Sequence, residues 1–142
     1  MQQEESEYIP AELAGTLDGL FRERVKRTPE KTAYSYYDRK EKKWLDLSWQ
    51  EMADLISRWQ ASLANTDLEK KDRIAICVKN SPEWVIADQA TLSMGMVVVP
   101  LYIDDRPDNI AYVIQDSGAK LLVIQSSKHW QTLIESSPNA LK

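Results

Sequence analysis

Three short apolar runs in the second half of the chain strongly restrict its fold. Residues 73–78 (RIAICV), 96–101 (MVVVPL) and 120–124 (KLLVI) lack the apolar–polar alternation of strands with one solvated face. Such runs are typical of strands buried on both faces of a parallel sheet. They start at residues 73, 96 and 120, a spacing that leaves room for one connecting helix each time, as parallel strands require. We therefore predict an α/β fold with a βαβαβ parallel-sheet unit.

Helix signals lie between and after these runs. Ser81 is a candidate N-cap followed by proline, and the helix it opens is expected to stop at Gly95. A second helix is predicted from residues 105–108 to Gly118, and a third after Ser126. The apolar residues expected to face inward in the second of these helices are Ile110, Val113 and Ile114, and the third is expected to run through Trp130, Leu133 and Ile134.

The first half predicts a helix, a β-hairpin and a second helix. Apolar residues at helical spacing follow Thr16 and end before Thr28, and residues 33–38 and 44–47 have strand character. The connector 39–43 holds four basic residues and one acidic one, which favours a solvated turn over an anion or membrane-surface contact. Ser48 and Glu51 form a capping box, which starts a helix. Its apolar stripe, expected to face the core, is Met52, Leu55, Ile56, Trp59 and Leu63.

The composition excludes several classes of protein. The 142 residues carry a net charge of −4, so no basic excess supports nucleic-acid binding. One cysteine and one histidine allow neither an internal disulfide nor a cysteine-based zinc site. The first ten residues are polar and acidic, unlike a secretory signal, and the longest apolar stretch is too short for a membrane span. We expect a cytoplasmic protein.

Ligands of open parallel sheets bind beyond the carboxyl ends of the strands, here residues 79–81, 102–106 and 125–128. These loops contain no dinucleotide fingerprint, P-loop or nucleophile elbow. His129 has no acidic partner at a telling spacing and is interpreted as a helix-surface residue, and Cys77 as a small core residue.

Two further clusters of polar residues lie at these loops. Asp104, Asp105 and Asp108 could attract a divalent cation, but helix capping is favoured because helix N-termini attract acids. Lys79, Asn80 and Lys128 could together meet a phosphate, although no spacing rule supports this hypothesis.

Several short blocks follow one another in a fixed order between residues 16 and 125. They are TL, LF, RV and TPEK at 16–31, LSWQEM at 47–52, DRIAI at 72–76, NSPEW at 80–84, GMVVVPLY at 95–102 and DSGAK at 116–120. In this order the blocks resemble the N-terminal part of adenylate-forming (AMP-binding) enzymes, specifically the long-chain fatty acid–CoA ligase (acyl-CoA synthetase) branch.

The resemblance implies ATP-dependent activation of a fatty acid to an acyl-adenylate, followed by thioester formation with CoA, with magnesium assisting the first step. The family's phosphate loop and later motifs appear nowhere in these residues, so no catalytic residue is carried over. Lys71 stands where the family usually has glycine. By resemblance, Tyr102, Ile103 and Asp104 approach the acyl and pantetheine channel; the alternative is that Tyr102 packs over the sheet edge.

The resulting prediction is an N-terminal fragment of such a ligase, inactive by itself and binding no cofactor. Residues 1–15 are expected to form a flexible tail and 16–142 a partial domain, with 16–72 leading into the parallel unit 73–142. The alternatives are a stand-alone α/β binding or interaction domain and a flavodoxin-like cofactor binder. Unpaired strand edges predict self-association, and any membrane contact is expected to be peripheral.

Overall fold

The computed structural model describes residues 8–137. They belong to two compact units, with the boundary between Arg58 and Trp59, inside one helix. The sequence suggests a different boundary, between residues 72 and 73, which would separate the lead-in from the parallel unit. This boundary stays a prediction. In chain order the elements are α1 (Ala11–Ala14), α2 (Leu17–Arg27), β1 (Thr32–Asp38), β2 (Lys43–Ser48), α3 (Trp49–Leu63), β3 (Arg73–Cys77), α4 (Pro82–Ser93), β4 (Val97–Pro100), α5 (Pro107–Ser117), β5 (Leu121–Ile124) and α6 (Ser127–Ser136).

The first unit is built around α2, the hairpin and the first turns of α3. The Thr16 side chain accepts a hydrogen bond from the Gly19 N–H at 2.9 Å and so caps α2, as expected. The rings of Phe21 and Trp49 meet edge to face with centroids 5.6 Å apart. The segment expected to be a tail also contributes: its described part holds the short helix α1 and buries Ile9.

Strands β1 and β2 form the antiparallel hairpin that the sequence predicts. The capping box is confirmed, because Ser48 Oγ accepts from the Glu51 N–H at 3.2 Å and Glu51 Oε2 accepts from the Ser48 N–H at 2.7 Å. These two bonds satisfy backbone donors at the start of α3 and fix the turn from strand to helix. Met52 and Ile56 of the apolar stripe are buried.

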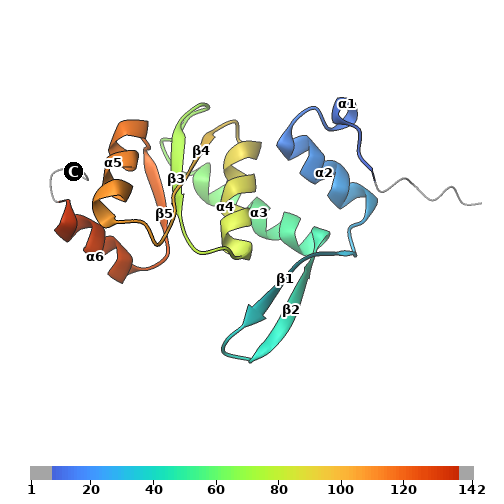
Figure 1. Ribbon diagram of the computed structural model, residues 1–142. Helices are drawn as coiled ribbons and strands as arrows, with labels where there is room; N and C mark the ends of the chain where they lie inside the picture. Colours follow the sequence, from blue (N-terminus) through green and yellow to red (C-terminus); the bar gives the residue numbers. More distant parts are fainter. Residues whose placement is uncertain (1–7, 138–142) are drawn as a thin grey trace, which may run out of the picture. The chain divides into compact units, whose positions relative to one another are not determined.

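The second unit contains a parallel three-stranded sheet in the order β4-β3-β5. This arrangement confirms the predicted βαβαβ unit and the mixed α/β fold. Helix α4 lies on one side of the sheet, and α5 and α6 lie on the other (Figure 1). In the central strand Ile74, Ala75, Ile76 and Cys77 are all at most 1% exposed. Burial on both faces therefore holds for β3, whereas β4 and β5, at the sheet edges, are only partly buried.

The helices of this unit start and stop at the expected residues, but the expected inward position is wrong for Val113, which is 36% exposed. In α6, Leu133 is buried, whereas Trp130 and Ile134 are 36% and 38% exposed. At 100° per residue, Ile110, Ala111 and Ile114 share one stripe of α5, and Val113 falls at its margin. Ala111 is buried instead.

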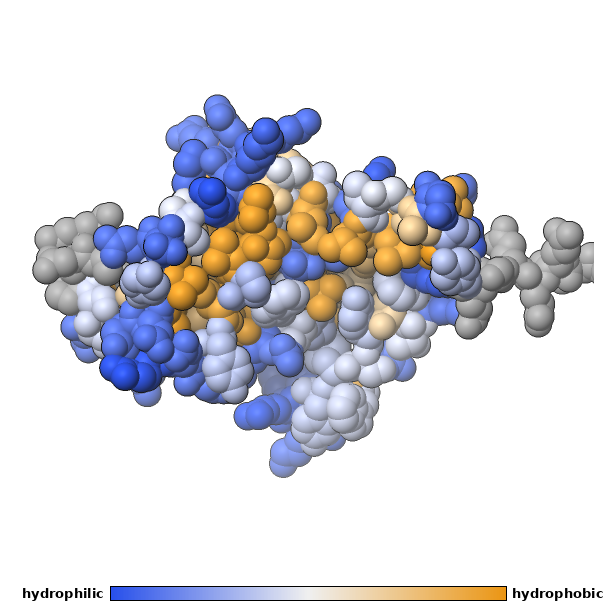
Figure 2. All heavy atoms as spheres, turned by 45° about the horizontal axis from the view of Figure 1, so that its top comes forward, coloured by the Kyte–Doolittle hydropathy of each residue, from blue (hydrophilic) through white to orange (hydrophobic). Residues whose placement is uncertain are grey.

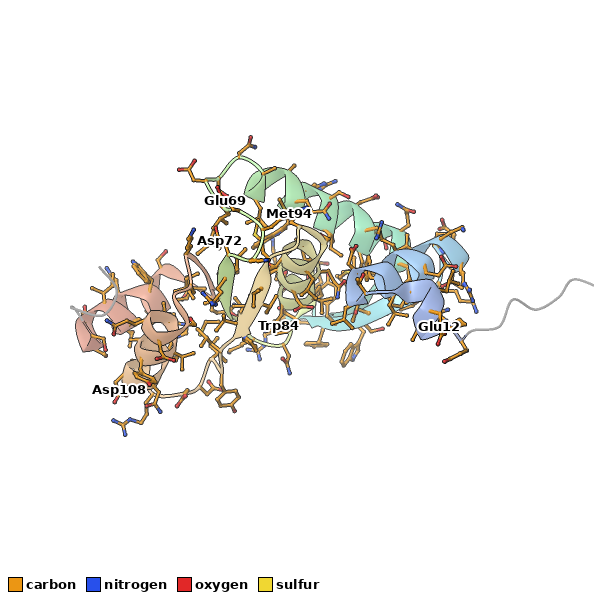
Figure 3. The ribbon with its side chains drawn as sticks, turned by 90° about the horizontal axis from the view of Figure 1, so that it is seen from above. Glu12, Glu69, Asp72, Trp84, Met94 and Asp108 are labelled. Atoms are coloured by element: carbon orange, nitrogen blue, oxygen red, sulfur yellow. The ribbon has the colours of Figure 1, made fainter. Side chains whose placement is uncertain are left out.

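A tight connector precedes the central strand. Lys71 adopts a φ of +72°, the left-handed conformation that favours glycine, and its N–H donates to the Gly95 carbonyl at 2.8 Å. Nearby, Asp72 Oδ2 accepts from the Glu69 N–H at 2.8 Å (Figure 3). The turn thus keeps a glycine-type geometry although the side chain is lysine.

Apolar side chains, orange in Figure 2, reach the surface between hydrophilic ones in blue. Among residues 8–137, none of the helices combines the length and the apolar character needed to cross a bilayer.

Candidate functional site at the strand ends

The parallel pairing brings the three predicted loops to one edge of the sheet. Strand β3 supplies the link, because its Ile76 carbonyl accepts from the Leu101 N–H at 2.9 Å and its Cys77 carbonyl accepts from the Gln125 N–H at 3.2 Å. Both bonds lie where β4 and β5 end. The loops that follow all three strands therefore start side by side, as the strand-end rule requires.

The loop after β4 is held by its own polar groups. The Tyr102 carbonyl accepts from the Asp105 N–H at 3.1 Å, which closes a turn. Asp105 Oδ1 accepts from the Arg106 N–H at 2.7 Å and from the Asn109 side-chain amide at 3.1 Å. These bonds, all local in sequence, fix the path of the chain into α5.

The three residues expected to line a substrate channel lie in different surroundings. Ile103 packs against the buried cluster of Cys77, Ile110 and Leu133 and anchors the loop. Tyr102 is 71% exposed, so most of its ring is free of packing contacts, and Asp104 is exposed as well. A ligand beyond the strand ends would meet Tyr102 and Asp104, whereas Ile103 serves the core. Their role in a channel stays a prediction.

The acidic residues of this loop fit one part of the helix-terminus interpretation. Asp108 lies in the first turn of α5, where the helix dipole favours an acid, but the N-cap is Arg106 and no side chain caps it, so the capping interpretation is wrong for the N-cap position itself. Arg106 instead forms an ion pair with Asp108 at 2.6 Å. Within residues 8–137 no cluster of three or more histidine, cysteine or acidic side chains is arranged to hold a metal ion.

The other two loops meet through an amide side chain. Gln125 Oε1 accepts from the Lys79 N–H at 2.8 Å and ties the loop after β5 to the loop after β3. Ser81 and Ser126 cap α4 and α6, as the sequence predicts. A phosphate contact by Lys79, Asn80 and Lys128 stays a hypothesis.

Cys77 has the surroundings of a structural residue, whereas those of His129 point to no particular role. Burial raises the pKa of the Cys77 thiol above its ordinary value, so the reactive thiolate is disfavoured and the core assignment holds. His129 is half-buried rather than a surface residue, and its Nδ1 lacks a hydrogen-bond partner among the described residues.

One titratable residue gives no signal in the sequence. Asp88 lies half-buried within α4, and burial raises the pKa of its carboxyl group, partly offset by a hydrogen bond from Gln89 at 3.3 Å. It lies within a helix, away from the strand-end loops, and no motif surrounds it in the sequence. Only the structure reveals that its environment is partly desolvated.

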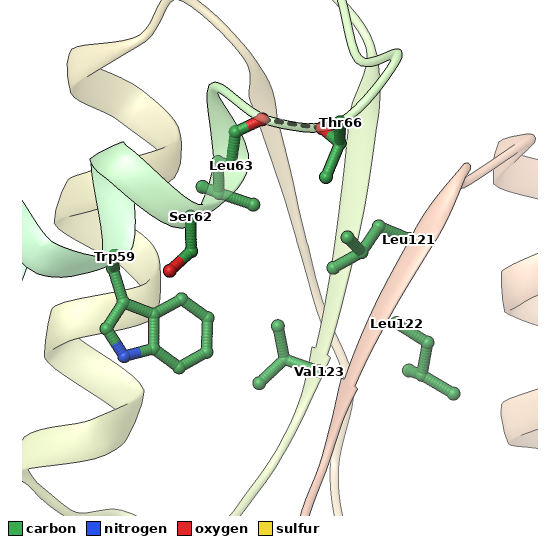
Figure 4. A pocket seen from close by; sticks show the side chains of 7 residues that line it. All are labelled: Trp59, Ser62, Leu63, Thr66, Leu121, Leu122 and Val123. Carbon is green, nitrogen blue, oxygen red and sulfur yellow. Dashed lines mark hydrogen bonds between the residues drawn. The ribbon is translucent and has the colours of Figure 1, made fainter.

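An apolar groove is a second feature that sequence reasoning missed. It has a volume of about 380 Å³ and lies between the end of α3 and β5 (Figure 4). The one hydrogen bond drawn within it runs from the Thr66 hydroxyl to the Leu63 carbonyl at 2.6 Å. With no titratable side chain in its lining, the groove suits apolar packing, not chemistry. The lining residues are Trp59, Ser62, Leu63, Thr66, Leu121, Leu122 and Val123.

The geometry defines a class: a parallel α/β unit with candidate ligand loops at its strand ends and a helix–hairpin–helix lead-in. The sequence profile of the AMP-binding enzyme family matches residues 21–142, most of the chain. The chain therefore belongs to the AMP-binding enzyme family.

Similarity extends to two kinds of family member. The chain is 31% identical over 94 residues to the long-chain-fatty-acid–CoA ligase FadD15 of Mycobacterium bovis, covering 66% of this chain and 16% of the ligase. It is 29% identical over 107 residues to a linear gramicidin synthase protein of Brevibacillus parabrevis, covering 75% of this chain and 1% of the synthase. Ligases and peptide synthases are thus about equally similar to it.

A solved structure supports the same assignment. The fused NpsA-ThdA adenylation–PCP di-domain protein from Klebsiella oxytoca superimposes with a TM-score of 0.70 at 28% identity, covering 79% of this chain and 20% of that protein. The chain spans only a small part of the relatives that it matches. The fold expectation is confirmed as the N-terminal domain type of AMP-binding enzymes, and the choice between branches stays open.

Proposed function

We propose that this chain is the N-terminal part of a long-chain fatty acid–CoA ligase. The complete enzyme would convert a fatty acid and ATP to an acyl-adenylate and pyrophosphate, and CoA would then displace AMP to give acyl-CoA. The observation that carries this proposal is the ordered set of family blocks, two of which lead directly into the strand-end loops after β3 and β4. ATP, magnesium and CoA belong to the complete enzyme in this proposal.

The proposed contribution of this chain is a wall of the acyl and pantetheine channel. Tyr102 and Asp104 are exposed where ligands of parallel sheets bind, and Ile103 anchors their loop in the core. The proposal assigns no general acid, general base or nucleophile to these residues. We therefore expect the 142-residue chain alone to form no thioester.

The first experiment is an assay of this chain for ATP-dependent acyl-CoA formation with palmitate. We expect no turnover above a buffer blank. Robust turnover would overturn the fragment hypothesis, because all catalytic groups would then lie within these residues.

The second experiment addresses the complete enzyme. Sequencing the transcript that encodes this chain should reveal, in frame downstream, the glycine-, serine- and threonine-rich phosphate loop. The corresponding full-length protein should then show ATP–pyrophosphate exchange that depends on palmitate. A stop codon directly after Lys142 would instead favour a stand-alone binding or interaction domain.

Amino-acid activation is the second candidate function, favoured by the 29% identity to the linear gramicidin synthase protein. A panel of the standard amino acids in the exchange assay separates the two. Exchange that depends on an amino acid, with none on palmitate, would replace the ligase proposal.

The channel wall can be tested in the same full-length protein. Replacing Tyr102 with alanine should raise KM for the acid or for CoA several-fold, with a smaller change in kcat. Tyr112→Ala is the matched control, because Tyr112 lies in α5 and is 64% exposed, similar to Tyr102 at 71%. Equal kinetics for the two variants would show that Tyr102 has no role in the channel.

A further inference from the structure

The backbone at the tip of the β1–β2 hairpin is closed by hydrogen bonds to a side chain. Asp38 Oδ1 accepts hydrogen bonds from the N–H groups of Lys40 at 2.8 Å and Glu41 at 2.9 Å. Lys42 adopts a φ of +53°, which completes the reversal of the chain. Because the turn is closed by these bonds, its side chains are displayed from a fixed frame.

Two aromatic side chains lie beside this turn without covering a core. Tyr37 and Trp44 are cross-strand partners in the hairpin register. Their rings meet edge to face with centroids 5.8 Å apart. Nevertheless Trp44 is 69% exposed and Tyr37 is 49% exposed. The two rings contact each other but remain largely exposed, which is typical of a contact surface.

The turn carries the opposite charge to the whole chain. Its basic side chains are exposed, and with the two acidic residues they give residues 38–43 a net charge of +2 in a protein of net charge −4. Asp38 is engaged by the turn backbone, and Glu41 lies 3.8 Å from Lys43. The remaining cations are thus available to meet external anions. The basic residues are Arg39, Lys40, Lys42 and Lys43.

We propose that this hairpin tip, residues 37–44, docks peripherally on an anionic lipid surface. Tryptophan and tyrosine favour the headgroup level of a bilayer, where the ring is buried and the polar edge stays hydrated. Adjacent lysine and arginine side chains pair with anionic headgroups. Nucleic acid fits less well, because the chain is acidic overall and the basic residues occupy one short turn. The inference is independent of the proposed ligase activity.

The experiment is sedimentation of the protein with vesicles of phosphatidylcholine and about 30% phosphatidylglycerol, and with phosphatidylcholine alone. We expect binding to the anionic vesicles only, weakened by about 0.5 M NaCl because salt screens the basic contacts. Two variants probe the tip. Lys40→Glu/Lys43→Glu should weaken binding by about tenfold or more, and Trp44→Ala should weaken it several-fold.

Matched controls keep the test specific. Lys26→Glu/Lys70→Glu changes the net charge equally at two exposed sites outside the hairpin, and Tyr112→Ala removes an exposed ring from α5. Both should bind as the wild type does, and far-ultraviolet circular dichroism checks that every variant folds. Quenching of tryptophan emission by brominated lipid should fall in Trp44→Phe.

Three results would overturn the proposal: no binding to anionic vesicles, equal loss in tip and control variants, or equal binding to neutral vesicles. If the protein binds single-stranded RNA instead of vesicles, and Lys40→Glu/Lys43→Glu loses that binding, the tip is a nucleic-acid contact.

Discussion

The two sheets of this protein bury their residues in opposite ways. Strand β3 lies between two parallel neighbours and is buried from Ile74 to Cys77. The hairpin alternates exposed and half-buried positions, and its exposed pair Tyr37 and Trp44 lies near the turn. A central strand is covered on both faces and paired on both edges, so its side chains serve stability. A two-stranded hairpin is not covered in this way, so some of its side chains are available for contacts with other molecules.

The largest expected difference concerns opening of the backbone around Cys77. Core strands open with free energies that approach global unfolding, about 5 kcal/mol or more in ordinary domains, so thiol labelling of the folded protein should be slower than in urea by about 5,000-fold or more. Burial also raises the thiol pKa, which lowers the thiolate fraction further in mildly alkaline buffer. The rate of reaction of Cys77 with a chromogenic disulfide, with and without urea, measures this difference. Labelling at the unfolded rate would show that the sheet opens readily and remove the contrast with the hairpin.

The next largest difference is expected between the stability losses caused by two side-chain truncations, one in β3 and one in the hairpin. Ile76→Ala should lower the free energy of unfolding by about 2–5 kcal/mol, because Ile76 is fully buried in β3 and the cavity cannot collapse easily. Leu45→Ala, at a half-buried position of β2, should cost clearly less. Urea unfolding with a common m-value provides the comparison. Equal losses would mean that the hairpin belongs to the same cooperative core.

The same contrast explains what the sequence could predict. The buried strands carry uninterrupted apolar runs, and Ser48 and Ser81 begin their helices by local hydrogen bonds, so short-range chemistry was sufficient. Burial of Val113 was wrong because helical spacing alone does not define where the neighbouring element ends. The exposure of Trp44 could not be predicted from the sequence either, since strand propensity is the same for a buried and an exposed ring.

At the site, position was predictable but environment was not. The strand-end rule located residues 102–104, yet the different surroundings of Tyr102 and Ile103 follow from tertiary packing against the Cys77 cluster. Asp88 and the groove beside Trp59 depend on contacts between elements distant in sequence. The sequence shows that residue 71 is lysine where glycine is expected. It does not show that the backbone keeps a glycine-type φ of +72° there.

That strained turn gives a smaller, paired test. Lys71 in the second unit and Lys42 in the hairpin both have left-handed backbones, with φ of +72° and +53°. Lys71→Gly should raise the free energy of unfolding by about 0.5–1 kcal/mol, since relief of strain exceeds the entropy cost of glycine. Lys42→Gly should stabilise only the hairpin and leave the unfolding of the second unit unchanged.

Chemical denaturation of both variants, with Lys70→Gly as control, tests this expectation. Residue 70 is not in the left-handed region, so glycine there should be neutral or destabilising. Destabilisation by Lys71→Gly would show that the lysine side chain contributes more than the strained backbone costs.

The smallest expected effect is electrostatic. Lys120 Nζ lies 2.8 Å from Asp72 Oδ1 in the second unit. The hydrogen bond from Lys120, followed by that from the Glu69 N–H, lowers the pKa of Asp72 below its ordinary value of 3.8, and Asp72 raises the pKa of Lys120 above 10.5. The carboxylate therefore contributes stability above pH 3.8 that is lost as the pH falls below it. The ammonium contributes below pH 10.5 and loses its effect as the pH rises further.

Lys120→Met should flatten the acid limb of stability between about pH 5 and pH 2.5, with a small change at neutral pH, because solvent screens the exposed ammonium. Glu41→Gln, which removes the hairpin's 3.8 Å pair with Lys43, should change the acid limb less, since both of its side chains are more than half exposed. Urea midpoints across this pH range measure both. If the two variants behaved alike, the Asp72 pair would be no better organised than a surface contact. If only Lys120→Met changed the acid limb, the second unit would hold its surface charges in stabilising pairs. The charged side chains of the hairpin would then contribute little to stability and be available for contacts with other molecules.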